Sequence, residues 1–228
     1  MIRIACLHTV DSNAAVFDAA LRTAGLAEVS LRHTVRPDLL AAAEREGRLT
    51  PEIAAQTVAI LQSLSAEADA VLLTCSTLGP AAEAASRDAP VAILRVDAAL
   101  AAEAVREGGR VVVLCAVETT VEPTRRLFEA AARATGAEVS VQVVPHAWDA
   151  FRAGDRDRYW ALTADAARAA KAQGAARVAL AQASMAGAAA LLPEAVRPLG
   201  SPAVGLAAAV AASRARQDAA LRLQAGRA

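Results

Sequence analysis

The fold is decided by the stretch Ala68-Asp-Ala-Val-Leu-Leu-Thr-Cys-Ser-Thr-Leu-Gly-Pro80. Its apolar run, Val71–Leu73, is typical of a short parallel strand that is buried on both faces. The segment Cys75-Ser-Thr77 follows this run, and Gly79-Pro80 opens a predicted helix. Because ligands of open α/β sheets bind outside the carboxyl ends of the strands, this thiol and these hydroxyls stand where such a fold places its chemistry.

The same pattern recurs in Arg177-Val-Ala-Leu-Ala-Gln-Ala-Ser-Met-Ala-Gly-Ala-Ala189. Aligning Cys75 with Gln182 gives an offset of 107 residues, since 182 − 75 = 107. The same offset brings the first apolar run, Arg3-Ile-Ala-Cys-Leu7, onto Arg110-Val-Val-Val-Leu114. Two regions that share one offset indicate an internal duplication.

Apolar strands that alternate with alanine-rich helices predict an α/β fold built from two pseudo-symmetric halves. We expect each half to be a flavodoxin-like parallel sheet of about four strands flanked by helices, with the active-site cleft between the halves. The predicted first half comprises residues 1–97 and 206–228, and the second comprises residues 98–205. The chain is expected to return to the first half because its last helix, from about Ala207 to Leu223, has no counterpart left in the second half.

Local signals place the remaining elements. Thr50-Pro51-Glu52 predicts a helix start, with Thr as the cap and Pro in the first turn. We expect a second strand at Glu28–Leu31 followed by a loop that contains His33, and a final strand around Ala203–Gly205.

Composition excludes several classes of partner. The chain has 24 basic and 24 acidic residues and a formal net charge of zero, so no strong field attracts nucleic acid or an anionic membrane. The apolar run Ala203–Ala212 is too short to cross a bilayer, and the first residues lack the layout of a signal peptide. These features predict a cytoplasmic protein.

The three cysteines, Cys6, Cys75 and Cys115, have neither C-x-x-C nor C-x-x-H spacing, which disfavours a structural zinc site. Cys6 and Cys115 lie within or at the end of apolar runs and are expected in the core. Cys75 has two interpretations. It is either a small buried hydrophobe that ends a strand, or a thiolate stabilised near a helix N-terminus, where it can act as a base or nucleophile.

The neighbours of Cys75 favour a site. Ser76 and Thr77 supply hydroxyl and backbone N–H groups that can hold an oxyanion or a carboxylate. Ser184 occupies the position of Thr77 in the repeat. His8 ends the first strand and is a further candidate, although a histidine there is more often a structural hydrogen-bonding residue.

In the second half, Thr119 and Thr120 follow the first strand, where they can cap the next helix, bind a carboxylate, or do both. The sequence contains no glycine-rich nucleotide-binding motif, no phosphate-binding loop and no G-x-S-x-G elbow. We therefore expect no nucleotide cofactor, no phosphoryl transfer and no α/β-hydrolase chemistry.

The order of these motifs resembles that of the aspartate/glutamate racemase superfamily, which includes hydantoin racemases, maleate isomerases and arylmalonate decarboxylases. Leu180-Ala-Gln-Ala-Ser-Met-Ala186 is similar to the second motif of hydantoin racemases, Leu-Gly-Cys-Ala-Gly-Met-Ala. The resemblance covers nearly the whole chain. It implies chemistry without a cofactor, in which one cysteine removes a proton from the α-carbon and a second delivers one to the opposite face.

Transferred by position, Cys75 matches the first cysteine of that family, and Ser76 and Thr77 match groups that bind the substrate carboxylate. Thr119 and Thr120 match the carboxylate-binding loop of the second half. Gln182 stands in place of the second cysteine, and an amide cannot exchange a proton near neutral pH. It can still hydrogen-bond a carboxylate or a carbonyl.

We therefore expect an isomerase of this superfamily that acts on a small carboxylate-bearing molecule with Cys75 as its single catalytic thiol. Two alternatives stay open, namely a decarboxylase of the arylmalonate type and a small-molecule binding protein without turnover. The family resemblance also implies a homodimer.

Overall fold

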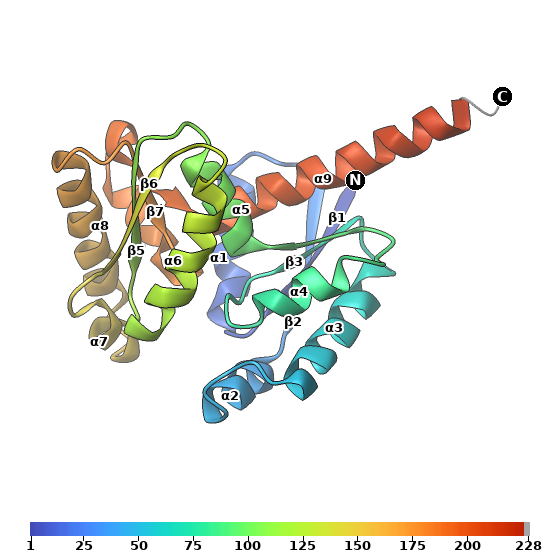
Figure 1. Ribbon diagram of the computed structural model, residues 1–228, viewed down its shortest axis with the longest axis horizontal. Coiled ribbons are helices and arrows are strands. Elements are labelled where there is room, and N and C mark those ends of the chain that lie inside the picture. Colours follow the sequence, from blue (N-terminus) through green and yellow to red (C-terminus); the bar gives the residue numbers. More distant parts are fainter. Residues whose placement is uncertain (226–228) are drawn as a thin grey trace. The chain divides into compact units, whose positions relative to one another are not determined.

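The computed structural model describes residues 1–225 and divides the chain into two units (Figure 1). The first unit is Met1–Val96 together with the chain from Gly205, and the second unit is Asp97–Val204. Each boundary expected from the sequence lies one residue further along the chain than the observed one.

The first unit is built on a parallel sheet with strand order β2-β1-β3-β4. Its strands are β1 (Ile2–His8), β2 (Val29–Val35), β3 (Ala70–Leu73) and β4 (Ala92–Arg95). Its helices are α1 (Ser12–Thr23), α2 (Pro37–Arg45), α3 (Pro51–Ser65), α4 (Gly79–Ala85) and α9 (Ser201–Ala225).

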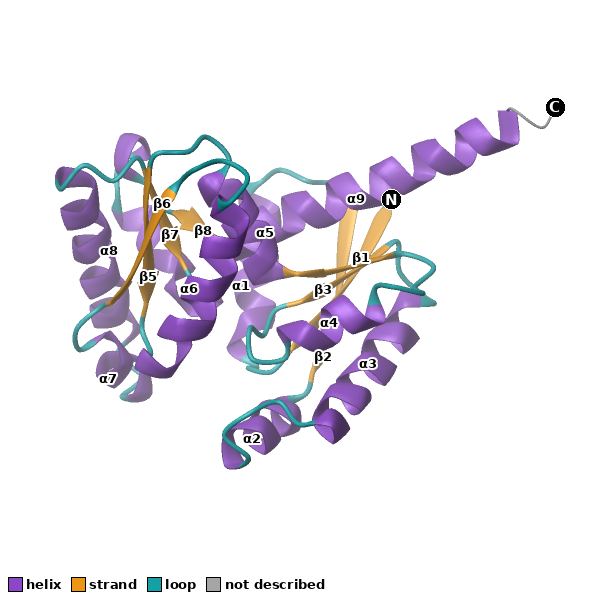
Figure 2. Cartoon of the chain, viewed as in Figure 1, coloured by secondary structure: helices purple, strands orange, loops and turns teal. Residues whose placement is uncertain are grey.

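The second unit repeats this topology with a parallel sheet of order β6-β5-β7-β8 (Figure 2). Its strands are β5 (Arg110–Cys115), β6 (Glu138–Val143), β7 (Arg177–Leu180) and β8 (Leu199–Gly200). Its α-helices are α5 (Val96–Val105), α6 (Val121–Ala132), α7 (Ala147–Arg152) and α8 (Arg156–Ala172). Three 3₁₀ helices complete it: η1 (Glu118–Thr120), η2 (Ala183–Leu191) and η3 (Glu194–Val196).

Strand register confirms the predicted duplication. In the first sheet Leu7 pairs with Leu73, and in the second sheet Leu114 pairs with Leu180, so both partners move by the same 107 residues. The backbone bond that follows each pair is also repeated. The N–H of Thr74 donates to the Leu7 carbonyl at 3.1 Å, and the N–H of Ala181 donates to the Leu114 carbonyl at 2.9 Å. Cys75 and Gln182 therefore occupy equivalent positions.

The packing of helices on the two sheets explains why the strands are short continuous apolar runs. In the first unit, Leu7, Leu73 and their neighbours pack on one face of the sheet against α2, α3 and α4. In the second unit both faces are covered. One face meets α7, α8 and η2, and the other meets α5 and α6. Strands that are buried on both faces need no alternation of polar residues, which matches the continuous apolar runs of the sequence.

Helix starts follow the predicted capping rules. The hydroxyl of Thr50 accepts a hydrogen bond from the N–H of Ile53 at 3.4 Å, and Pro51 fills the first turn of α3. The carboxylate of Asp155 accepts from the N–H of Arg158 at 3.1 Å and begins α8.

Two expectations are wrong. His33 does not lie in a loop, because β2 continues to Val35 and pairs with β1 along the whole length of that strand. The final strand is not at residues 203–205, which belong to α9. It is the short β8, Leu199–Gly200. The cause is Ser201-Pro202, since proline fits the first turn of a helix and lacks the N–H that a continuing strand would need.

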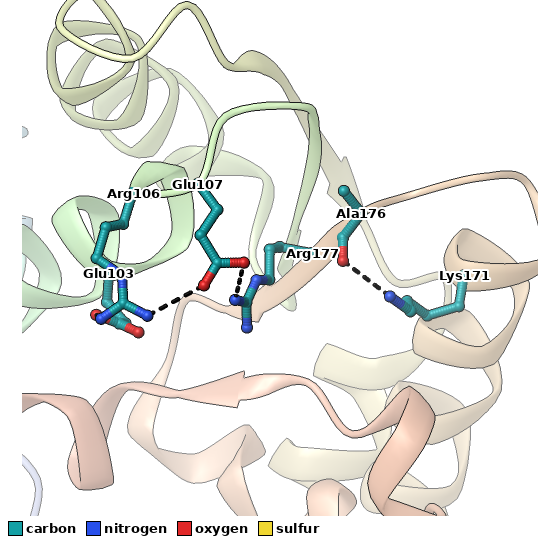
Figure 3. A network of polar contacts seen from close by, with 6 residues as sticks. All are labelled: Glu103, Arg106, Glu107, Lys171, Ala176 and Arg177. Carbon is teal, nitrogen blue, oxygen red and sulfur yellow. Dashed lines mark hydrogen bonds and ion pairs between the residues drawn. The ribbon is translucent and has the colours of Figure 1, made fainter.

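The amino-terminal edge of the second sheet is held by charged contacts (Figure 3). The guanidinium of Arg177, the first residue of β7, pairs with Glu107, which also accepts a bond from Arg106 at 3.2 Å. Lys171 donates from Nζ to the carbonyl of Ala176 at 2.8 Å. The hydrogen bond with Arg177, and to a smaller extent the one with Arg106, lowers the pKa of the Glu107 carboxyl. This network lies at the end of β7 opposite Gln182.

In the part of the chain that the structure describes, no helix is both long enough and apolar enough to cross a membrane.

Candidate functional site

Cys75 lies just beyond β3 in the first unit, at the carboxyl edge of the sheet. Its side chain is buried, with 9% of the residue exposed, and belongs to the same apolar cluster as Leu73 and Leu78. The polar groups that follow are more accessible, because Ser76 is half-buried and Thr77 is exposed. A thiol backed by the core and bordered by accessible hydroxyls is a geometry in which one sulfur atom can meet a bound ligand.

Arg95 brings a cation to this edge, which the sequence interpretation missed. It ends β4, and its guanidinium lies so close to Gly79 that a β-carbon there would overlap Cζ. Its side chain is 14% exposed and pairs with Glu83. Glycine at position 79 thus lets a largely buried guanidinium lie over the start of α4, four residues after Cys75. The signal in the sequence was a single arginine at the end of a strand that otherwise looked apolar.

His8 is fully buried at the carboxyl end of β1 and is bonded on both sides. Its Nδ1 lies 2.8 Å from Oγ1 of Thr74, and its Nε2 lies 2.8 Å from Nδ1 of His33. The chain continues from Nε2 of His33 to Oδ1 of Asp18 at 3.1 Å. Burial and the neighbouring His33 lower the pKa of His8 to about 4. With both ring nitrogens engaged inside the unit, these contacts favour a positioning role for His8.

Cys6 lies on the same face of the sheet as His8, two residues earlier in β1. It is fully buried, as expected for a core residue, and burial raises the pKa of its thiol to about 12. One ligand atom from each of Cys6, His8 and His33 lies within 4.8 Å of the other two, so these three side chains can share a metal ion.

In the second unit, Gln182 connects the ends of β7 and β5. Its Oε1 accepts a hydrogen bond from the N–H of Ala116 at 2.8 Å, and its Nε2 donates to Oγ1 of Thr120 at 3.0 Å. The Thr120 hydroxyl in turn donates to the carbonyl of Val117 at 2.7 Å. Gln182 and Thr120, which the sequence proposed separately, are therefore direct partners. Thr119 is exposed in the adjoining 3₁₀ turn.

Cys115 is fully buried beneath this pair, and its sulfur lies 3.8 Å from Oγ1 of Thr124. Burial raises the pKa of its thiol, although hydrogen bonds with Thr120, Thr124 and Gln182 oppose that shift. The expectation that Cys115 is a core residue agrees with its burial, but its sulfur lies among polar groups.

Ser184 is held by two aromatic residues of α8. Its hydroxyl lies 2.9 Å from the hydroxyl of Tyr159, and its carbonyl accepts from Nε1 of Trp160 at 2.9 Å. Burial raises the pKa of Tyr159 to about 12. The Trp160 ring packs so closely on Gly187 that a β-carbon there would overlap the ring. The sequence pattern did not point to Tyr159, because its bond to Ser184 depends on how α8 crosses η2.

The structure thus forms two polar strand edges, one in each unit. The first unit gathers Cys75, Ser76, Thr77 and His8 at its edge and adds Arg95. The second gathers Thr119, Thr120, Gln182 and Ser184 at the equivalent edge.

Comparison with known proteins links this arrangement to one family. The sequence model of the Asp/Glu/hydantoin racemase family matches residues 5–213. No curated protein sequence matches the chain.

Several solved structures share the fold. The aspartate racemase of Picrophilus torridus superposes with a TM-score of 0.68 at 12% identity, over 93% of this chain and 94% of that one. The allantoin racemase of Pseudomonas fluorescens gives 0.61 at 16% identity, over 93% and 91% of the two chains. The maleate isomerase of Pseudomonas putida gives 0.56 at 15% identity, over 90% and 89%.

Proposed function

Because the chain belongs to the Asp/Glu/hydantoin racemase family, we propose that it is an isomerase with Cys75 as its single catalytic thiol, acting on a small carboxylate-bearing molecule. The proposed reaction uses neither a catalytic metal ion nor an organic cofactor. The observation that carries the proposal is the repeated strand register, which puts Cys75 and Gln182 at equivalent places. One of the two positions bears a thiol, and the other bears an amide.

A site with one thiol favours chemistry that needs one ionisable group. As a thiolate, Cys75 can add to one carbon of a substrate double bond, so that an S–C bond forms and the π bond becomes a carbanion stabilised by the neighbouring carboxylate. Rotation about the resulting single bond and expulsion of the thiolate then give the other geometric isomer. This isomerisation needs no second residue that transfers a proton. The same thiolate can also exchange the α-proton of a substrate on one face.

The substrate carboxylate has candidate partners in each unit. In the first, the hydroxyls of Ser76 and Thr77 lie on the turn next to the guanidinium of Arg95. A planar guanidinium suits bidentate binding of a carboxylate, and its place over Gly79 supports this role. We propose Thr119, Thr120, Gln182 and Ser184 as ligand-binding groups of the second. Arg95→Gln is expected to raise KM for the substrate more than it lowers kcat, because Arg95 binds the part of the substrate that does not react.

A decarboxylase is the second candidate, and Gln182 is the observation that favours it. Loss of CO₂ leaves a carbanion that requires a proton on one face, which a single protonated Cys75 can deliver. The amide of Gln182 can meanwhile hydrogen-bond the remaining carboxylate.

The experiment is NMR of the purified protein in D₂O with a panel of amino acids, hydantoins, maleate and substituted malonates. Deuterium at an α-carbon identifies proton exchange, a changed double-bond geometry identifies isomerisation, and lost CO₂ identifies a lyase. The isomerase proposal fails if CO₂ loss is the only reaction. It also fails if ligands raise the melting temperature while none of them is converted, which would indicate a binding protein.

A further inference from the structure

We infer that Cys6, His8 and His33 form a binding site for a zinc-type metal ion inside the first unit. Their ligand atoms lie within 4.8 Å of one another. Cys6 and His8 point to the same face of the sheet because they are alternate residues of β1. His33 joins them because it is the direct partner of Cys6 in β2. No metal-binding spacing appears in the sequence, since the ligands come from two strands that are neighbours only in the sheet.

The two histidines are oriented as metal ligands usually are. A histidine that binds a metal with one ring nitrogen normally donates from the other to a carboxylate, a backbone carbonyl or water, which fixes its tautomer. His33 has Asp18 at 3.1 Å from Nε2, and His8 has Thr74 at 2.8 Å from Nδ1. The remaining nitrogens, Nε2 of His8 and Nδ1 of His33, face each other at 2.8 Å.

One arrangement of the protons favours a cation between these nitrogens. In this arrangement Nε2 of His33 donates to the carboxylate of Asp18. In the same arrangement the Thr74 hydroxyl donates to the carbonyl of Leu7 at 3.1 Å and accepts from a proton on Nδ1 of His8. Two lone pairs are then directed at each other, an arrangement that a bound cation turns from repulsive to favourable. Without an ion, the Thr74 hydroxyl must turn from Leu7 to His8, so that every hydrogen bond of the chain points towards Asp18.

The donor set determines the class of metal. One thiolate and two imidazoles suit Zn²⁺ and similar borderline ions, whereas Mg²⁺ and Ca²⁺ require oxygen ligands. With Zn–N bonds of about 2.0–2.1 Å in tetrahedral geometry, the two nitrogens must lie about 3.3 Å apart. The rings therefore need to separate by roughly half an ångström from their 2.8 Å contact. Binding converts the Cys6 thiol to a thiolate and releases its proton to solvent.

The site is distinct from the proposed chemistry at Cys75, which uses none of these ligands. An ion here would join β1 to β2 and, through Thr74, fix the backbone that leads directly into Cys75. Its expected role is to stabilise the carboxyl edge of the first sheet. Failure of this proposal would leave the proposed function untouched.

The test is titration of the chelator-treated protein with Zn²⁺, followed by calorimetry, and with Co²⁺, followed by absorption. We expect one ion per chain, a rise in melting temperature, and with Co²⁺ a thiolate charge-transfer band together with the visible bands of tetrahedral cobalt. Cys6→Ser is expected to remove the charge-transfer band, and His33→Gln to weaken binding at least tenfold.

The chain supplies matched controls. His146 is exposed and far along the sequence, and Cys75 and Cys115 are the only other thiols. His146→Gln, Cys75→Ser and Cys115→Ser are expected to bind both ions as the parent protein does. Asp18→Asn keeps every ligand and alters a half-exposed side chain, so it should fold. It is expected to lose about 10- to 100-fold in affinity because His33 is no longer oriented.

Three results would overturn the inference. These are the absence of stoichiometric binding by the folded parent protein, Co²⁺ binding without a thiolate band, and loss of the band in Cys75→Ser or Cys115→Ser. Equal affinity in Asp18→Asn and the parent protein would refute the orienting role assigned to Asp18.

Discussion

The carboxyl edges of the two sheets share one backbone and differ in chemistry. In the first unit, the buried thiol of Cys75 follows the Leu7–Leu73 pair. Hydrogen-bond contacts connect Thr74 through His8 and His33 to Asp18. In the second unit, the same position leads to Gln182, whose amide is bonded to Ala116 and Thr120. The duplicated fold thus preserves where polar groups can stand, while each copy has acquired its own set of them. Four predictions test how far that asymmetry extends.

The largest expected effect is that of Cys75→Ala on turnover. If this thiol alone exchanges the proton or forms the adduct, its removal should reduce kcat by at least about 10²-fold, the usual minimum for a general acid or base. The measurement is the NMR assay in D₂O, with circular dichroism to verify folding. Cys115→Ala is the matched control for a buried thiol and should retain activity. Full activity of the folded Cys75→Ala variant would refute the mechanism.

Gln182→Cys should make the two edges chemically alike. A second thiol at the equivalent position would provide a proton donor that the amide cannot be, so α-proton exchange with a bound substrate should rise about tenfold or more. Gln182→Ser is the control, because it loses the same amide bonds to Ala116 and Thr120 without adding a thiol. No gain over Gln182→Ser would mean that register equivalence does not extend to the reacting atoms.

The third prediction concerns Ser184 and Thr77, which occupy equivalent positions. Ser184 shares a hydrogen bond with the buried Tyr159, whereas Thr77 is exposed. Tyr159→Phe should lower the free energy of unfolding by about 1 kcal/mol, and Thr77→Ala should leave it nearly unchanged. Urea denaturation measures both, and equal effects would contradict the difference between the edges.

The pH dependence sharpens this third test. Burial raises the pKa of Tyr159 to about 12 from an ordinary value of 10.0. The unfolded chain therefore ionises this tyrosine first, so its contribution to stability is complete below pH 10 and is lost as the pH rises towards 12. Tyr159→Phe should show a smaller loss of stability over that interval.

The smallest effect is expected at the opposite edge. Asp69 accepts bonds from the backbone N–H of Arg3 at 2.7 Å and from its guanidinium at 3.2 Å, whereas the equivalent of Asp69 in the second unit is Ala176. Arg3 lowers the pKa of the Asp69 carboxyl. Asp69→Asn should cost less than about 1 kcal/mol.

The contribution of Asp69 to the free energy of unfolding changes with pH in the opposite direction to that of Tyr159. Its stabilising contribution is present above the ordinary pKa of 3.8 and is lost as the pH falls through the lower folded value. The difference in melting temperature between Asp69→Asn and the parent protein should therefore shrink below pH 3.8. A difference that grows on acidification would contradict this assignment.

A feature can be predicted from the sequence when the residues that cause it lie close together in the chain or repeat at a constant offset. Buried strands, the cap at Thr50 and the equivalence of Cys75 with Gln182 arise from local pattern or from one constant offset, and the structure agrees with them. The extent of β2 is different, because a strand at the edge of a sheet extends as far as its partner β1 permits. His33 was therefore misplaced.

The polar partners of the site were harder to predict. Three side chains contact a residue of a different helix or strand, namely Arg95, Asp18 and Tyr159. Neither hydrophobic periodicity nor residue spacing predicts such contacts. The bond between Gln182 and Thr120 joins two residues that were both proposed from the sequence. Their direct contact follows only from the adjacency of β5 and β7.

The path of α9 has a consequence for biosynthesis. Gly205 packs against Leu72 and Val96, Arg214 pairs with Glu28, and Arg216 donates to the carbonyl of Pro90 at 2.6 Å. The first unit is thus closed by a segment that a ribosome makes after the whole of the second unit. The second unit is continuous in sequence, so it can complete its core while the earlier sheet still waits for its last helix. A nascent chain released before α9 emerges would expose Leu72 and Val96, and chaperones would be expected to recognise that surface.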